Sequence, residues 1–386
     1  MRILQLVQKP QRRGAEVFAY QLSQTLRNKG HQVCSVYLYP YQEQGGLALH
    51  SGDQVLDGRV THPLEKVPGV HPALLRRLHG KLDEFQPDVV QVNGANTVKY
   101  GAFARMKRRR PSWVLIYRNI GAPQDWVRGW QRRFFYQRLV MPQLDGVVGV
   151  SQTTLTTVRS FYNLTVPCQT IPNGIAVQEE VALSRSLLRQ RLGVAQDAPV
   201  LLTVGSLSTE KRIDRLLRVT GEVRKSVPDL QLWIVGDGPE RERLEAQAAQ
   251  AGLTNIVHFL GVQEDVASYM AAADLFLLTS DTEGIPAVIL EAGAQGLPVV
   301  ATKVGGLAEC VLEGETGTLV TPEDEAGFAD AVSMLLCDPA RCNMMGARAR
   351  NWICGNFAME AIAQQYLTFY AEVLAQRQRE QGVKHQ

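Results

Sequence analysis

Short apolar runs alternate with amphipathic stretches along almost the whole chain. In the first half, runs rich in β-branched and apolar residues, which are typical of buried strands, lie at residues 2–7, 31–38, 88–92, 113–117 and 146–150. After the first run, residues 14–29 carry apolar side chains on a helical period and stop before Gly30, a residue type that commonly follows a helix. Alternating strands and helices predict a doubly wound α/β domain with a parallel sheet.

The second half repeats this pattern. Its expected strands lie at 200–204, 230–235, 256–260, 275–279 and 298–302, and its expected helices include 212–225 and 240–251. We therefore predict two Rossmann-like domains, over residues 1–168 and 169–362. Residues 363–386 are predicted to form a helix that packs back on the first domain and ends in a frayed polar tail. The expected ligand site is a cleft at the carboxyl ends of the strands.

The composition of the 386 residues is that of a soluble globular protein, with 45% hydrophobic and 20% charged residues. Six cysteines without a C-x-x-C spacing argue against a disulfide framework or a zinc site. The first apolar run is too short for a signal peptide, and no stretch approaches the roughly 18 apolar residues of a membrane span. We therefore expect a cytoplasmic protein.

Charge is divided unevenly between the two halves. Residues 1–190 carry a net charge of +13 and residues 191–386 a net charge of −10. Either the basic half meets an anionic partner, or charge is simply partitioned unevenly. No recognition motif supports nucleic acid, so we expect no nucleic-acid partner. An anionic membrane surface remains a candidate, which would place the protein peripherally at the inner face of the cytoplasmic membrane.

Two basic segments are candidates for such a membrane contact. One is the run of four cations at 107–110, which ends a predicted helix and needs no packing partner. The other, at 124–141, mixes arginines with aromatic residues. There we expect Trp130 and Phe134, four residues apart on one helical face, to pack on the domain core, and we regard the run at 107–110 as better placed for lipid.

The most informative stretch runs from Glu283 to Glu291. It follows a buried strand, and Pro286 suits the first turn of a helix because its missing N–H costs nothing there. The free amides at the start of this helix favour an anion such as a diphosphate. The two carboxylates that flank them are acceptors for sugar and ribose hydroxyls. An ordinary surface helix with an acidic first turn is the alternative.

A second candidate lies at the turn after the predicted strand at 200–204. Gly205 would let the backbone approach a ligand. Lys211 and Arg212 are expected to open the next helix, where a cation opposes the helix dipole unless an anion offsets it. This conflict favours phosphate binding over two solvated basic residues. Gly305 and Gly306 form a further place where the backbone could approach a bound ligand.

Several motifs follow one another along the chain. They are R-G-A-E at 13–16, D-G-V-V-G-V-S at 145–151, I-P-N-G at 171–174, V-G-S-L-S-T-E-K-R at 204–212, V-G-D-G-P-E-R at 235–241, F-L-G-V at 259–262, the E-x7-E segment at 283–291 and P-V-V-A-T-K-V-G-G-L-A-E at 298–309. In this order they resemble the motifs of family 4 retaining glycosyltransferases of GT-B fold. The resemblance covers nearly the whole chain, and its later motifs are the more specific ones.

This resemblance implies a role for each matched residue. The expected catalytic residues are Lys211, which would neutralise the diphosphate, Glu283 and the helper Arg212. Those expected to bind the donor are Gly14, Asn173, Gly205, Ser206, Gly236, Val262, Gly284, Ile285, Pro286, Ala287 and Glu291. Glu291 would bind the ribose. No metal site and no cofactor are expected, because Lys211 and the helix N-terminus supply the positive charge.

The chain departs from the family pattern in two places. Ser206 stands where the family usually has Arg, and the usual His is missing after two N-terminal strands. Asn93, Arg118 and Asn119 lie at those strand ends and are the candidates for the acceptor side.

The expected function is transfer of a hexose from a nucleotide-diphosphate sugar, with UDP-sugar favoured, to a glycan or lipid-linked acceptor. The expected setting is synthesis of cell-surface polysaccharide or glycolipid. A nucleotide-sugar-binding subunit without turnover and a sugar-nucleotide epimerase of the same fold are the alternatives.

Overall fold

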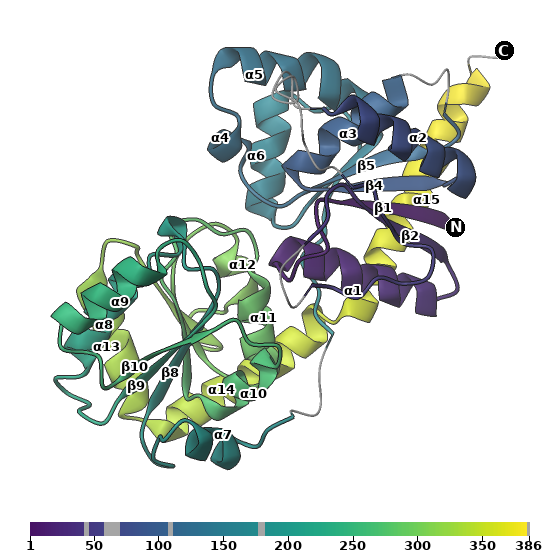
Figure 1. Cartoon of the computed structure of the whole chain (residues 1–386). Helices are drawn as coiled ribbons and strands as arrows, with labels where there is room; N and C mark the ends of the chain where they lie inside the picture. Colours follow the sequence, from purple (N-terminus) through teal and green to yellow (C-terminus); the bar gives the residue numbers. More distant parts are fainter. Residues whose placement is uncertain (42–45, 58–69, 107–110, 177–181, 384–386) are drawn as a thin grey trace. The chain divides into compact units, whose positions relative to one another are not determined.

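The computed structural model describes residues 1–41, 46–57, 70–106, 111–176 and 182–383, without the side chains of residues 125 and 381–383. The chain divides into two compact units (Figure 1). The first comprises Met1–Gly174 and Met359–Gln386, and the second comprises Ile175–Ala358. The basic run at 107–110 lies outside the described residues.

A parallel sheet with the strand order β3-β2-β1-β4-β5-β6-β7 forms the centre of the first unit. Its strands are β1 (Arg2–Val7), β2 (Gln32–Tyr37), β3 (Gln54–Val55), β4 (Val89–Asn93), β5 (Val114–Asn119), β6 (Gly146–Gly149) and β7 (Cys168–Thr170). Its helices are α1 (Gly14–Asn28), α2 (Pro72–Phe85), α3 (Ala95–Met106), α4 (Pro123–Trp126), α5 (Trp130–Phe135), α6 (Gln152–Tyr162) and α15 (Met359–Val383), with a π-helical turn η2 (Tyr136–Val140) and a 3-10 turn η3 (Met141–Gln143).

Side chains of the first sheet alternate between two cores, as the pleat of a strand requires. Ile3 of β1 faces the core under α1 and α15, where the rings of Phe18 and Tyr366 lie 5.9 Å apart. Its neighbour Leu4 faces the core under α2, α3 and α6. Both faces of this sheet are therefore covered by helices, as a parallel sheet needs.

The second unit repeats the plan with the parallel order β10-β9-β8-β11-β12-β13. Its strands are β8 (Val200–Val204), β9 (Gln231–Val235), β10 (Val257–Gly261), β11 (Leu275–Leu278), β12 (Val299–Thr302) and β13 (Gly317–Val320). Its helices are α7 (Arg185–Arg191), α8 (Ile213–Val223), α9 (Arg241–Gln250), α10 (Val266–Ala272), α11 (Ala287–Ala294), α12 (Leu307–Cys310), α13 (Glu325–Leu336) and α14 (Pro339–Asn356), with a 3-10 turn η4 (Thr209–Lys211).

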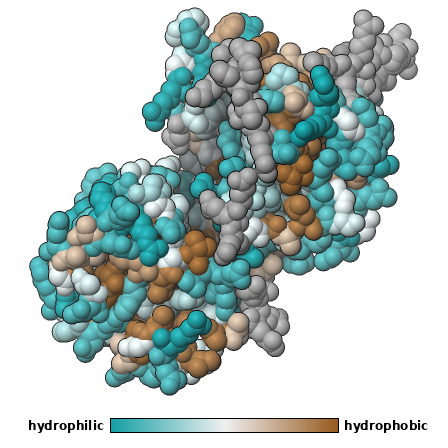
Figure 2. All heavy atoms as spheres, viewed as in Figure 1, coloured by the Kyte–Doolittle hydropathy of each residue, from teal (hydrophilic) through white to brown (hydrophobic). Residues whose placement is uncertain are grey.

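The order of the strands places a topological switch point in each sheet, between β1 and β4 and between β8 and β11. Loops that leave the carboxyl ends of such neighbouring strands turn to opposite sides and open a crevice, which is where doubly wound sheets bind ligands. On the face drawn in Figure 2, the surface of the second unit is mostly hydrophilic with scattered apolar patches. No helix in the described part of the chain is long and apolar enough to cross a bilayer.

The predicted strands are all present, but β3, β7 and β13 were not predicted. Each is short, at two to four residues, and lies at or beside an edge of its sheet, so its hydrophobic run is weak. Because β7 pairs with β6, the first unit extends to Gly174 and not to residue 168.

The C-terminal helix begins at Met359, before the predicted residue 363, and is helical through Val383. Residues 384–386 of the predicted frayed tail lie outside the described residues. Arg377 fixes its last turns, since its guanidinium pairs with Asp145 at 2.6 Å and donates to the Pro111 carbonyl.

Candidate functional site

Glycine backbones shape the crevice at the carboxyl ends of β8 and β9. A Cβ atom on Gly236, whose φ is +130°, would lie 1.8 Å from the Gly205 carbonyl oxygen. The two loops are joined by a hydrogen bond of 2.9 Å from the Gly205 amide to the Val235 carbonyl. Position 236 therefore has to be glycine, because any side chain there would collide with the backbone of the Gly205 loop. Beside this junction lies a small pocket whose lining includes Gly205, Ser206 and Lys211.

Lys211, which lines this pocket, pairs with Glu283 across the switch point between β8 and β11. The Lys211 ammonium donates to Oε1 of Glu283 at 2.6 Å, and the Ser280 hydroxyl donates to the same oxygen at 2.7 Å. The Glu283 side chain is 9% exposed and that of Lys211 22%. In a pair this shielded from water, each charge offsets part of the cost of removing the other from solvent.

The backbone of Glu283 is held by the loop after β12. Gly305 has a φ of +55°, and a Cβ atom there would lie 1.7 Å from the Glu283 carbonyl oxygen. The Gly306 amide donates to the Gly284 carbonyl at 2.9 Å. The two glycines therefore let this loop pack against the Glu283 segment. This packing explains why glycine is found at both positions without any approach of a donor.

The α11 helix begins beside Glu283. Pro286 is its N-cap and not part of its first turn, and no side chain caps the helix there. The first amides of a helix have no carbonyl partner within the preceding turn, and of those in α11 the Ile289 amide donates to the Pro286 carbonyl at 3.1 Å. The segment Gly284–Ala287 thus leads directly into a helix N-terminus that can hold an anion.

Glu291 lies one turn further along α11. Burial raises the pKa of its carboxyl to about 7. The residue is half-buried, and no described residue gives its side chain a hydrogen bond or an ion pair, although a carboxylate shielded from water is costly without one. An unpartnered carboxylate beside a helix N-terminus is suited to accept hydrogen bonds from a ligand's hydroxyl groups.

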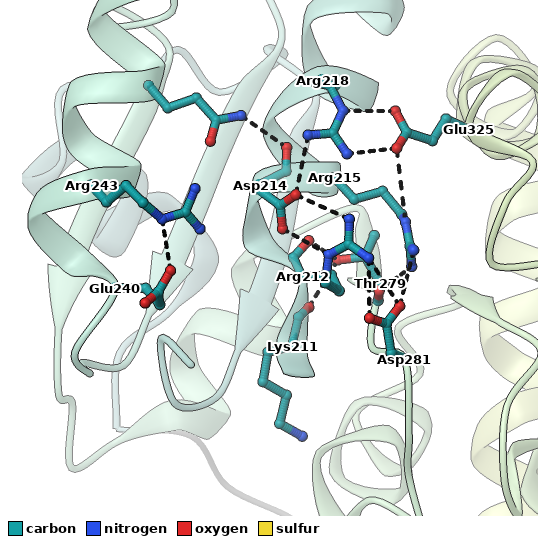
Figure 3. A network of polar contacts seen from close by, with 11 residues as sticks. Lys211, Arg212, Asp214, Arg215, Arg218, Glu240, Arg243, Thr279, Asp281 and Glu325 are labelled. Atoms are coloured by element: carbon teal, nitrogen blue, oxygen red, sulfur yellow. Dashed lines mark hydrogen bonds and ion pairs between the residues drawn. The ribbon is translucent and has the colours of Figure 1, made fainter. Parts of the chain in front are cut away.

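Arg212 does not join Lys211 in this site. Its backbone is left-handed, with a φ of +51°, and it precedes α8 as the N-cap instead of opening the helix. Figure 3 shows the Lys211 side chain extending away from the cluster in which Arg212 lies. The guanidinium pairs with Asp214 at 3.0 Å and Asp281 at 3.1 Å, and these hydrogen bonds raise its pKa. The anions that offset this cation are thus the protein's own carboxylates, which corrects the expectation of a phosphate.

Three residues that the sequence did not single out fix the loops of the site. The Thr279 hydroxyl donates to the Arg212 carbonyl at 2.9 Å, and Arg215 donates to the Thr279 carbonyl at 2.8 Å. Arg215 also pairs with Asp281 at 2.9 Å, and Ser280 holds Glu283. For Thr279 and Ser280, the signal that could have indicated them is the polar stretch directly after the apolar strand β11. Arg215 lies within α8 and has no such signal.

The remaining donor candidate of the second unit lies after β10. Val262 is 68% exposed and directly follows Gly261, whose carbonyl accepts from the Gly236 amide at 2.8 Å. An apolar side chain exposed at the carboxyl edge of the sheet is suited to contact a base. The second unit thus brings together Gly205, Ser206, Lys211, Glu283 and Gly284, with Gly236 and Val262 on the neighbouring strands and Glu291 one turn into α11.

The candidates of the first unit are mostly buried. Gly14 is exposed at the start of α1, but Asn93, Arg118, Asn119 and Asn173 are 6%, 0%, 1% and 8% exposed. Asn93 donates to Oε1 of Gln5 at 2.9 Å. The three acceptor-side candidates are therefore part of the unit's interior, and none is exposed enough here to touch an acceptor.

Arg118 and Asn119 also point to opposite faces of the sheet. Arg118 stacks over Phe18 of α1, with its guanidinium carbon 4.0 Å from the ring centre, and donates to Oδ1 of Asn173. Burial lowers the pKa of Arg118. Asn119 instead donates to the Thr154 carbonyl of α6 at 3.2 Å. The pleat separates neighbouring residues in this way, so these two acceptor-side candidates cannot act at the same point.

Two Rossmann-like parallel sheets, the second with a helix N-terminus and a Lys–Glu pair at its switch point, define a GT-B type glycosyltransferase fold. The chain is similar to Anabaena HepE in a complex with UDP and glucose, with a TM-score of 0.81 and 25% identity, over 96% of this chain and 100% of that one. It is similar in fold to sucrose-phosphate synthase from Thermosynechococcus elongatus, with a TM-score of 0.82 and 23% identity, over 97% of this chain and 100% of that one.

Family comparison places the chain more narrowly. Residues 12–179 match the model "Glycosyltransferase Family 4", and residues 184–352 match "Glycosyl transferases group 1". The chain belongs to the family 4 type glycosyltransferases.

Its curated relatives include N-acetyl-alpha-D-glucosaminyl L-malate synthase of Bacillus anthracis, which is 33% identical over 61% of this chain, and the lipopolysaccharide core glycosyltransferase LpsE of Rhizobium meliloti, which is 34% identical over 47%. The matched parts span 62% and 53% of those two proteins.

Proposed function

We propose that the protein transfers a hexose, with retention of configuration and without a metal ion, from a nucleotide-diphosphate sugar to a glycan or lipid-linked acceptor. The observation that carries this proposal is the Lys211–Glu283 pair, 2.6 Å apart beside the N-terminus of α11. As the sugar–phosphate bond breaks, negative charge develops on the diphosphate, and positioned cations and amides stabilise it.

The proposed roles follow the chemistry of each group. The Lys211 ammonium and the amides of Gly284–Ala287 hold the diphosphate. Glu283 and Glu291 accept hydrogen bonds from sugar and ribose hydroxyls. Arg212 acts at a distance from the ligand by fixing the loop that carries Lys211.

The chemical step is proposed as attack on the face that the diphosphate leaves. The acceptor hydroxyl oxygen bonds to the anomeric carbon as the bond from that carbon to the phosphate oxygen breaks. A phosphate oxygen takes the hydroxyl proton, so the nucleoside diphosphate leaves with that proton and the configuration is retained. Isolation of a glycosyl adduct on a protein side chain would rule this step out.

The donor and acceptor are proposed from the relatives. HepE structures hold UDP or UDP-glucose, which supports a UDP-sugar, whereas a mannosyltransferase of Mycolicibacterium smegmatis, 35% identical over 55% of this chain, is named GDP-mannose-dependent. The names of that enzyme and of LpsE support a glycolipid or lipopolysaccharide acceptor. Such an acceptor fits a peripheral location at the inner face of the cytoplasmic membrane.

A panel of UDP-, GDP- and ADP-sugars tests the donor site by thermal shift. The true donor should raise the melting temperature through mass action, and Lys211→Ala should abolish that rise. Lys225→Ala is the matched control, since Lys225 also pairs with a glutamate at 2.6 Å but is 71% exposed. If Lys211→Ala responds to the donor as the control does, the site is wrongly assigned.

Transfer or hydrolysis from the labelled donor then tests turnover. Binding without either would indicate a silent nucleotide-sugar-binding subunit, and interconversion of the donor without an acceptor would indicate an epimerase.

A further inference from the structure

The segment from Arg128 to Leu139 carries an unusual group of exposed side chains, which we call the α5 surface. Trp130, Phe134 and Leu139 are 76%, 58% and 40% exposed. Trp130 is the most exposed large hydrophobic side chain in the described part of the chain. In Figure 1, α5 lies at the periphery of the first unit. The expectation that Trp130 and Phe134 pack on the core is therefore wrong.

Neighbouring residues of the same segment supply the core contact instead. Phe135 stacks on Phe103 of α3 with ring centres 6.0 Å apart, and Tyr136 and Val140 are buried. Since these residues already hold the segment in place, Trp130 and Phe134 are left free to contact something outside the unit. Two large aromatic side chains kept in water are unfavourable unless a partner covers them.

The arginines of the α5 surface form no ion pair with any carboxylate whose side chain the structure describes. Arg132 donates to the Trp126 carbonyl at 3.3 Å and Arg133 to the Phe161 carbonyl at 3.1 Å, while Arg138 lies 5.8 Å from the ring centre of Phe134. No described carboxylate pairs with these arginines or with Arg128. By contrast, the arginines of α8 each pair with an aspartate or glutamate.

We propose that the α5 surface docks on an anionic phospholipid bilayer. Trp130 and Phe134 enter the boundary between headgroups and acyl chains, where tryptophan is enriched, and the arginines contact lipid phosphates. A second copy of the chain fits less well, because a two-fold interface would place each group of arginines against its equivalent. The proposal is independent of the sugar-donor site, which lies in the other unit.

Sedimentation of the full-length protein with vesicles tests this docking. We expect binding to phosphatidylcholine vesicles containing about 30% phosphatidylglycerol, release by salt, and no binding to phosphatidylcholine alone. Trp130→Ser with Phe134→Ser should weaken binding about tenfold or more. Arg128→Gln with Arg138→Gln should weaken it about 30-fold and reduce its salt dependence, since two of the four arginines remain.

Matched changes in the second unit serve as controls. Met334→Ser removes a side chain that is 57% exposed, and Arg348→Gln with Arg350→Gln removes the same charge from exposed positions. Both controls should bind vesicles as the wild type does. On binding vesicles, the wild type should show a blue shift of its tryptophan emission, because the Trp130 ring enters the bilayer. Trp130→Phe should still bind but should not show this shift. A purely structural role of Trp130 would produce no such shift.

Three results would overturn the proposal. The first is that the wild-type protein binds neither the anionic nor the phosphatidylcholine vesicles, or binds both equally. The second is a Trp130→Ser, Phe134→Ser variant that binds as the wild type does. The third is a concentration-dependent dimer that this variant abolishes, since the surface would then be covered by a second copy. The thermal shift with the sugar donor is recorded on every variant, so loss of the fold and failure of the donor site are detected separately.

Discussion

The carboxyl of Glu291 should make donor binding depend on pH near neutrality. Burial raises its pKa to about 7 from the usual 4.5, and no described residue partners it. Ribose hydroxyls need the ionised form as an acceptor. If only that form binds, the Kd for a nucleotide-sugar should be constant above pH 8 and rise about tenfold per unit below pH 7.

The raised pKa of Glu291 also affects the stability of the fold, but there the ionised form is the unfavourable one. Because the folded pKa is raised, the contribution to stability is present below pH 4.5 and is lost as the pH rises through 7. The ionised carboxylate then costs the folded protein about 3 kcal/mol. Glu291→Gln should therefore unfold at higher denaturant concentration than the wild type at pH 8, and this difference should vanish near pH 4.5.

Isothermal titration with the best nucleotide-sugar of the panel at pH 6, 7 and 8 measures the binding effect. A nucleotide-sugar is used because a free nucleoside diphosphate has its own phosphate ionisation near neutrality, of pKa about 6 for a phosphate monoester. Glu291→Gln should bind more weakly and without the pH dependence. A wild-type Kd that is flat from pH 6 to 8, or a Gln variant that keeps the slope, would refute the assignment.

Three further predictions concern the loops that hold the site. Gly305→Ala should lower the free energy of unfolding by about 3 kcal/mol or more and weaken donor binding, because its Cβ would collide with the Glu283 carbonyl. The control Gly252→Ala, at a φ of +68° with nothing within 4 Å, should cost about 1 kcal/mol and leave binding intact. Denaturation and donor titration of both variants check this. Arg212→Gln should change stability by under about 1 kcal/mol and the donor Kd by less than about threefold, since its guanidinium serves half-exposed ion pairs; a large loss of kcat with unchanged Kd would instead make it catalytic. Arg215→Met should cost about 2 kcal/mol, measured by denaturation, because it leaves the buried Thr279 carbonyl without its donor and leaves Asp281 paired with Arg212 alone. An unchanged midpoint would show that water replaces the Arg215 guanidinium.

Much of the fold could be predicted because parallel strands buried on both faces are continuous apolar runs. The strands β1 and β8 begin and end where the sequence predicts. The short strand β13 could not be predicted in this way, because the four residues Gly317–Val320 form too short a run beside a glycine. A hydrophobic pattern can reveal a strand only if enough of the strand's residues are buried.

The site was predictable in its residue types but not in its directions. The sequence and the family resemblance indicated Lys211, Glu283 and Glu291, which the structure places around one helix N-terminus. They could not indicate that Arg212, the next residue after Lys211, turns away, since this depends on a left-handed φ of +51°. Likewise the helical spacing of Trp130 and Phe134 indicated a shared face, but not whether that face is buried or exposed.

The pairing of Lys211 with Glu283 implies a competition when the donor binds. In the free protein the ammonium is held by the carboxylate at 2.6 Å, so a diphosphate must draw Lys211 away from Glu283. The released carboxylate, still held by Ser280 at 2.7 Å, can then accept hydrogen bonds from the sugar. Glu283→Gln should therefore bind the nucleoside diphosphate alone more tightly, by about three- to tenfold, because Lys211 no longer has an anionic partner to leave. The same variant should lose the affinity that the sugar adds, so the ratio of the two Kd values separates the two roles. If Glu283→Gln weakens both ligands equally, the pair is a structural support for the loop and not a switch between partners.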